Sequence, residues 1–343
     1  MRKLLFLLPG TTQNFFAGGL TAELQTLKLA QQICDAEVVT YRQREPDTRF
    51  LEDVLAGSTS GDSAVRGNSG GFEHQNIFVV SWGFDVPKLL KKIDDRPTIY
   101  HAHSSGYGFR VPARVPIITV SRNSMGYWGE KALGSLIYWL PNALSPDFEN
   151  RRLSRDVDIL VQARKSSEYL LNQLVPALQK QCNVVLLDHY VDDLVGLFNR
   201  SKIYLYDSAE YWGRYRLTEG FGLPPLEALA CGCQVFSSVN HALADYLDPG
   251  FNAHKISSYA TGYDVQKILQ VLDAWENLPT PSPEFFQPYS ADSLLPRLRN
   301  ILTEINAFFD YQTQHSSDIA VLTRRRIATL TSKRILKKLQ RNK

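Results

Sequence analysis

The stretch Glu219-Gly-Phe-Gly-Leu-Pro-Pro-Leu-Glu227-Ala-Leu-Ala-Cys-Gly232 decides how the second half of the chain is interpreted. It lies downstream of residues 203–206, a short apolar run of the kind that forms a buried strand. Proline suits the first turn of a helix, where its missing N–H would have no partner, and glycine suits the position just past a helix end. The stretch therefore predicts a strand, a glycine-rich loop and a helix from about residue 223 to residue 231.

The loop and the start of this helix have the features of a ligand site. Gly220 and Gly222 allow the backbone to approach a ligand closely, and the free N–H groups of a helix N-terminus attract a diphosphate. Glu219 and Glu227 supply carboxylates that can accept hydrogen bonds from hydroxyl groups. A ligand site and a pair of solvated surface carboxylates both fit these residues.

Short apolar runs alternate with longer helical patterns along most of the chain. Such alternation indicates parallel sheets covered by helices. Two series of predicted strands lie at residues 4–8, 38–41, 77–81, 98–101 and 117–120, and at 158–162, 184–187, 203–206 and 234–237. The pattern predicts an α/β protein with two Rossmann-like, doubly wound domains that face each other across a cleft.

The 343 residues suit two domains of ordinary size. Polar and turn-forming residues after Leu140-Pro-Asn142 place the boundary near residue 152, which gives domains at 1–152 and 153–310 and a tail at 311–343. Residues 57–71 are rich in glycine and serine and predict a mobile surface loop.

The composition, with 44% hydrophobic and 21% charged residues, is typical of a globular protein. No apolar run approaches the roughly 18 residues that span a bilayer, and four cysteines without a disulfide pattern fit a reducing compartment. We therefore expect a cytoplasmic protein, either free or peripheral on the inner membrane face.

The tail carries most of the positive charge. Residues 324–343 hold nine Lys or Arg and no acidic residue, whereas the whole chain has a net charge of +3. Three interpretations stay open: a helix on an anionic membrane surface, a solvated extension, and a nucleic-acid contact, which the absence of any recognisable nucleic-acid-binding module disfavours.

The segment from Glu219 to Gly232, in the form E-G-F-G-L-P-x-L-E-A-x-A-C-G, resembles the donor signature of family 4 glycosyltransferases, which have the GT-B fold. Further stretches follow in the order of that family: Gly18-Gly19 after the first strand, His103, Val120-Ser121, Leu140-Pro-Asn142-Ala, Arg164-Lys165, Ser208 and Asp245. The resemblance covers residues 4 to about 255 and implies a retaining transferase that uses a nucleotide sugar.

The resemblance also implies roles for individual residues. Glu219 would contact the donor hexose, Glu227 would hold the nucleotide ribose, and the amides around Phe221 and Gly222 would meet the sugar and phosphates. Cations that neutralise the leaving diphosphate correspond to Arg164 and Lys165, adjacent here although separated in most of the family. The full predicted site consists of catalytic His103, Glu219, Arg164 and Lys165, and donor-binding Gly18, Gly19, Asn142, Ser208, Gly220, Phe221, Gly222, Leu223 and Glu227, with Arg164 and Lys165 in both groups.

Several interpretations of individual residues remain open. His101 lies on the same side of its strand as His103, and residues 209–218, longer than in the family, could cover the donor, meet the acceptor or be structural. No metal and no cofactor are expected besides the nucleotide sugar as co-substrate; Asp156-Val-Asp158 looks like a domain-start turn. The predicted activity is hexosyl transfer to a glycan, lipid-linked or small-molecule hydroxyl, with a nucleotide-sugar epimerase and a non-catalytic nucleotide-sugar-binding scaffold as alternatives.

Overall fold

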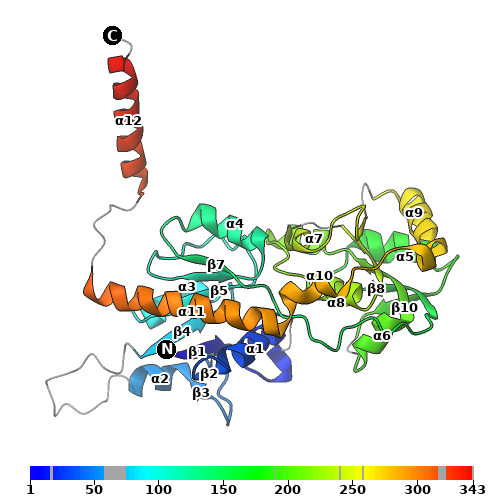
Figure 1. Cartoon of the computed structure of the whole chain (residues 1–343), viewed down its shortest axis with the longest axis horizontal. Coiled ribbons are helices and arrows are strands. Elements are labelled where there is room, and N and C mark those ends of the chain that lie inside the picture. The colour runs from blue at the N-terminus through cyan, green and yellow to red at the C-terminus, as the bar shows by residue number, and fades with distance from the viewer. Residues whose placement is uncertain are drawn as a thin grey trace.

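The computed structural model describes residues 1–15, 18–57, 75–189, 191–238, 241–256, 259–315 and 322–341. It contains two parallel sheets placed side by side, each covered by helices (Figure 1). The predicted architecture of two doubly wound domains is therefore confirmed. The predicted loop at 57–71 lies outside the described residues, except that Gly57 ends a helix.

The first sheet has the strand order β3-β2-β1-β4-β5-β6-β7, the arrangement of a Rossmann-like fold. Its strands are β1 (Lys3–Leu8), β2 (Ala36–Thr40), β3 (Arg49–Phe50), β4 (Asn76–Val80), β5 (Thr98–Ala102), β6 (Ile117–Thr119) and β7 (Ile137–Trp139). The connecting helices are α1 (Gly18–Gln31), α2 (Leu51–Gly57), α3 (Val86–Ile93) and α4 (Arg122–Lys131), with a short 3-10 turn η1 (Gln13–Phe15) before α1.

Strand β1 shows why this sheet is a doubly covered layer. Of its six residues, only Lys3 is not hydrophobic, and successive side chains point to opposite faces. Leu4 and Phe6 pack into one core, whereas Leu5 and Leu7 pack into another on the far side of the sheet. Both faces of the strand are buried, so its sequence has no polar alternation.

The second sheet has the order β12-β11-β10-β8-β9. Its strands are β8 (Val157–Gln162), β9 (Val184–Leu187), β10 (Ser201–Tyr206), β11 (Gln234–Ser237) and β12 (His254–Lys255). The helical segments of this half are η2 (Leu170–Leu174), α5 (Val175–Leu178), α6 (Leu194–Arg200), α7 (Ala209–Tyr215), α8 (Leu223–Ala230), η3 (His241–Asp245), α9 (Thr261–Asp273), η4 (Trp275–Asn277), α10 (Pro283–Phe286) and η5 (Gln287–Tyr289).

Helix α11 (Ala291–Gln314) corrects the predicted extent of the second domain. Its buried residues Leu298, Leu302 and Ile305 join Leu4 and Phe6 in a core of the first sheet, and the helix lies along α1 (Figure 1). Residues 291–310 therefore belong structurally to the first domain, because their apolar stripe covers a face of that sheet. The boundary near residue 152 stays a prediction; it falls between β7 and β8.

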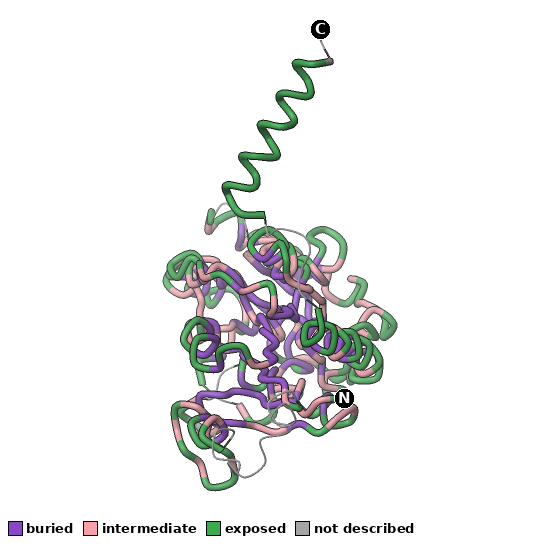
Figure 2. The backbone as a smooth tube through the Cα atoms, turned by 90° about the vertical axis from the view of Figure 1, so that its left-hand side faces the viewer, coloured by how far each residue is buried: buried purple, intermediate pink, exposed green. Residues whose placement is uncertain are grey.

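Helix α12 (Arg324–Arg341) stands apart from both domains (Figures 1 and 2). Every described residue of this segment is exposed, including Ile327, Leu336 and Leu339. No helix in the described part of the chain is long and apolar enough to cross a membrane.

Candidate active site

A cleft of about 480 Å³ lies between the two sheets. Its walls are built from the segments that follow β1, β4 and β5 in the first domain and β8 and β10 in the second, so both sheets contribute the carboxyl ends of their strands. Ligands of open α/β sheets bind at this edge. Eleven of the predicted site residues line the cleft: Gly18, Gly19, His103, Asn142, Arg164, Lys165, Glu219, Gly220, Phe221, Gly222 and Leu223.

The carboxylate of Glu219 is held from one side only. Its Oε2 accepts hydrogen bonds from Tyr206 Oη at 2.5 Å, Trp212 Nε1 at 2.7 Å and Ser208 Oγ at 3.4 Å. Oε1 has no hydrogen bond among the described residues and is not enclosed by protein. Glu219, only 6% exposed, thus presents one fixed acceptor to the cleft.

Tyr206 and Trp212 were not among the predicted site residues, and Ser208 supports the site instead of lining it. The aromatic residues within 209–218 were the sequence signal that could have pointed to Trp212, but only the folded structure shows which of them contacts Glu219. Residues 209–215 form α7, which places the Trp212 indole against Glu219 and Tyr211 at the cleft wall.

Lys165 lies beneath the same helix. Its Nζ is 4.5 Å from the centre of the Trp212 ring and 5.1 Å from that of Tyr211, within cation–π range. Burial lowers the pKa of the ammonium, and the charge of Glu219 opposes that effect. The backbone of Lys165 has φ of 68°, a left-handed conformation that a lysine rarely adopts and that local packing must maintain. Arg164, by contrast, is exposed at the rim.

The loop before α8 is shaped by glycine. Gly222 has φ of 79° and caps the helix, and an added Cβ would lie 2.2 Å from Leu243. Tyr246 Oη donates to the carbonyl of Phe221 at 3.0 Å, which fixes the loop from below. Among the described residues, the amides of Gly222 and Leu223 donate no backbone hydrogen bond, so they are available to an anion.

Glu227 lies one turn inside α8 and is not among the residues that line the cleft. It is partly buried, and its carboxylate has no hydrogen bond among the described residues. Burial raises the pKa of Glu227 to about 7. A partly enclosed carboxylate without a partner next to a cleft is typical of a ligand-binding group.

Two further polar groups of the cleft have no partner among the described residues. Ser81 Oγ and Asn142 Oδ1 are buried and have no hydrogen bond among the described residues. On the first-domain wall they lie with the aromatic side chains of Trp82, Phe84 and Tyr107. Sequence reasoning missed these three, because only the end of β4 and the loop after β5 bring them together.

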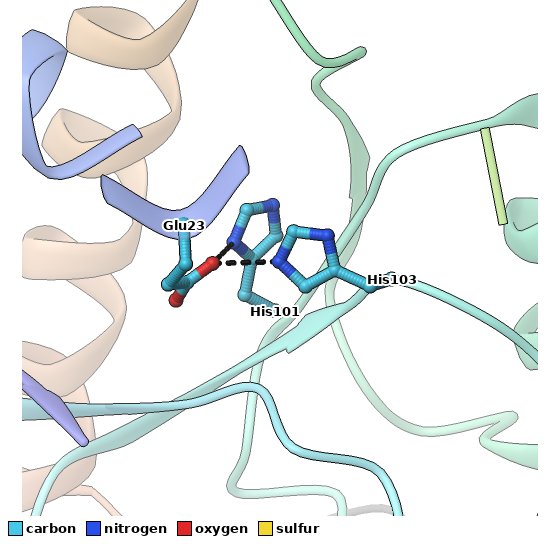
Figure 3. A group of neighbouring side chains, drawn as sticks. All are labelled: Glu23, His101 and His103. Atoms are coloured by element: carbon cyan, nitrogen blue, oxygen red, sulfur yellow. Dashed lines mark hydrogen bonds and ion pairs between the residues drawn. The ribbon is translucent and has the colours of Figure 1, made fainter. Parts of the chain in front are cut away.

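His103 lies at the cleft and belongs to a buried cluster with Glu23 and His101 (Figure 3). The three side chains are of types that bind metal ions, and their ligand atoms lie within 4.8 Å of one another. In the structure one carboxylate oxygen accepts directly from a nitrogen of each ring. The expected absence of a metal stays a prediction.

Asp156 and Asp158 pair with Arg200 and Lys202 at the start of β8, away from the cleft.

The two domains touch around this site. Thr218 receives hydrogen bonds from Ser104 and Asn123 of the first domain, through its carbonyl at 2.7 Å and its hydroxyl at 3.2 Å. Close by, the backbone of Gly220 passes the carbonyl of His103 so tightly that an added Cβ would lie 1.5 Å from that oxygen. The cleft is therefore in a closed arrangement.

Comparison with known proteins finds a sequence similarity in the second domain. The model of the family "Glycosyl transferases group 1" matches residues 163–283. A serotype-specific mannosyltransferase of Escherichia coli, WbdA, is 36% identical over 85 residues, which is 24% of this chain. The chain spans only about 8% of the length of that relative.

Solved structures extend the similarity of fold to both domains. Sucrose-phosphate synthase from Thermosynechococcus elongatus has a TM-score of 0.65 at 12% identity, over 90% of this chain and 100% of the other. HepE from Anabaena, in complex with UDP and glucose, has a TM-score of 0.61 at 14% identity, over 88% of this chain and 100% of the other. The chain therefore shares the two-domain GT-B fold, and its residues 163–283, which include the signature around Glu219, are similar to the group 1 glycosyltransferases.

Proposed function

We propose that the protein is a retaining glycosyltransferase that moves a hexose from a nucleotide sugar to a hydroxyl acceptor without a metal ion. The observation that carries this proposal is Glu219, whose one carboxylate oxygen is fixed by three donors while the other faces the cleft. Such a fixed acceptor suits sugar hydroxyls. It lies beside the cation of Lys165, which suits a diphosphate.

The chemistry follows from these positions. The donor diphosphate would lie between Lys165, Arg164 and the free amides of Gly222 and Leu223, which stabilise the negative charge that develops as the anomeric C–O bond breaks. The acceptor hydroxyl would attack from the same face and pass its proton to the leaving phosphate oxygen. The lysine and arginine cations supply the positive charge that a metal supplies in other transferases.

The relatives support the choice of donor class. WbdA is described as a mannosyltransferase, and HepE was solved with UDP-glucose. We therefore infer a nucleotide-activated hexose as donor. On the opposite wall, Trp82, Phe84 and Tyr107 offer aromatic faces, and Phe84 is 67% exposed. Aromatic rings pack well against the C–H faces of pyranoses, which favours a glycan or another sugar-bearing acceptor.

Glu227 gives a test of donor binding. Nucleotide binding should release up to about one proton per protein between pH 6 and 7, because ribose hydroxyls that donate to Glu227 stabilise its ionised form and lower a pKa of about 7. Calorimetry of UDP, UDP-glucose and GDP-mannose in buffers of different ionisation enthalpy measures this release. Glu227→Gln should weaken binding and abolish the release. The proposal fails if no nucleotide or nucleotide sugar binds the wild type.

Helix α12 supports a peripheral membrane location. Its exposed cations Lys333 and Lys337 lie four residues apart on one side of the helix, while Ile335 and Leu339 lie on another. We expect anionic vesicles to float the full-length protein and the charge-reversed Lys333→Glu/Lys337→Glu variant to bind them at least about tenfold less, at roughly 1 kcal/mol per cation. Equal flotation of the two proteins, or binding to neutral vesicles, would contradict the idea. Preferential binding of nucleic acid would replace it.

A further inference from the structure

The cluster of Glu23, His101 and His103 connects α1 with the end of β5 directly beside the cleft. Glu23 Oε2 accepts from His101 Nδ1 and from His103 Nε2, each at 2.6 Å (Figure 3). Glu23 is 1% and His101 2% exposed, whereas the His103 side chain is 16% exposed and lines the cleft. One buried carboxylate thus holds two imidazoles, of which only one can meet a ligand.

Glu23 remains ionised in this position. Burial alone would raise the pKa of a carboxyl group, but the charge of His101 and the hydrogen bonds from both imidazoles outweigh burial and lower the pKa of Glu23 to about 2. An ionised carboxylate only accepts hydrogen bonds, so both contacting ring nitrogens must carry a hydrogen. His103 is therefore protonated at Nε2.

The protonation state of the other ring nitrogen of His103, Nδ1, follows from the same argument. Burial, and next the neighbouring His101, lower the pKa of the His103 imidazole, and they outweigh the opposing hydrogen bond and charge of Glu23; the lowered pKa favours the neutral ring. A neutral ring with a hydrogen on Nε2 has a lone pair on Nδ1. Nδ1 points away from Glu23 (Figure 3), and it is the ring nitrogen left for a ligand in the cleft.

We propose that Glu23 is a positioning residue that fixes the His103 tautomer, so that His103 Nδ1 accepts a hydrogen bond from a hydroxyl of the transferred sugar and does not bind a phosphate oxygen. A lone pair attracts the hydrogen of a hydroxyl and repels an anionic oxygen. The inference rests on the proposed function, and it assigns the first-domain side of the cleft to the sugar, opposite Lys165.

The first experiment needs no substitution in the cluster. Long-range ¹H–¹⁵N correlation spectra of protein labelled in its histidines, with His103 assigned from the His103→Gln variant, report which ring nitrogen is protonated. We expect a hydrogen on Nε2 and a bare Nδ1 at pH 7.5. Addition of the nucleotide sugar that binds should shift the Nδ1 resonance, whereas the nucleotide diphosphate alone should not. A protonated Nδ1, or equal shifts with both ligands, would overturn the proposal.

Two variants then separate positioning from a structural role. Glu23→Leu removes the acceptor and should lower kcat about 10- to 100-fold, with nucleotide affinity unchanged within threefold. Glu23→Gln keeps an oxygen for both imidazoles and should retain the tautomer and most of kcat. Lys28→Gln, an exposed change on the same helix, serves as the control. Equal loss in both Glu23 variants would refute the role of the tautomer.

A metal site is the competing interpretation of the same three residues. We expect elemental analysis of the purified protein to find no stoichiometric metal. We also expect added Zn²⁺ to leave the ring-nitrogen resonances of His101 and His103 unchanged. A metal that co-purifies at one equivalent, with activity lost to a chelator, would overturn the proposal. The histidine spectra of the free protein do not depend on turnover, so they test this proposal separately from the proposed function. Absence of nucleotide-sugar binding would show that the proposed function is wrong.

Discussion

Gly220→Ala is expected to lower kcat/KM by at least about 100-fold while each domain stays folded. The added Cβ would lie 1.5 Å from the carbonyl oxygen of His103. That neighbour is backbone, so it cannot rotate away as a side chain would, and the two domains must separate or both loops must shift. A displacement of about 1 Å at reacting groups is enough for a loss of this size.

Gly213→Ala is the matched control, because a Cβ at this glycine of α7 meets nothing within 4 Å. We expect it to keep wild-type activity. Kinetics, thermal melting and small-angle X-ray scattering of both variants test the argument, since open domains increase the radius of gyration. A Gly220→Ala enzyme with kcat/KM within threefold of wild type would show that the closed arrangement is not needed for turnover.

The same position shows where sequence reasoning reached its limit. A glycine after Glu219 predicts close approach of the backbone to something, and a ligand was the natural candidate. The structure places the first domain there instead: the carbonyl of His103, after β5, touches the loop before α8. Contacts between segments more than 100 residues apart carry no local signal. By contrast, strand β11 was predicted at its observed bounds and helix α8 to within one residue of its end, because both depend on local patterns.

Short edge elements and supporting residues were missed for a related reason. β3 and β12 have two residues each, too few for a periodic pattern. Glu23 is a lone acidic residue in α1, and only the fold brings it under His101 and His103. The resemblance supplied His103 as a site residue, but it could not supply the carboxylate that sets its tautomer.

Glu219→Gln should lower kcat about 100- to 1000-fold with little change in stability. The new amide must place its oxygen toward Tyr206 and Trp212, because both only donate to this position. Its NH₂ group then occupies the side that faces the cleft, where the wild type presents an acceptor. In the wild type, a sugar hydroxyl can donate its hydrogen to the charged carboxylate. In the variant the same hydroxyl would face an uncharged NH₂ group that cannot accept this hydrogen, both before and during transfer.

Two measurements decide whether this interpretation is right. Affinity for the nucleotide diphosphate should stay within about threefold, because its proposed contacts lie at Lys165 and the α8 amides, so the loss should appear in kcat and in affinity for the intact nucleotide sugar. Glu210→Gln, which removes an exposed carboxylate of α7, should behave as wild type. If Glu219→Gln retained kcat, or lost diphosphate and sugar binding alike, Glu219 would be a structural anchor for Trp212 and the sugar would have to bind elsewhere in the cleft.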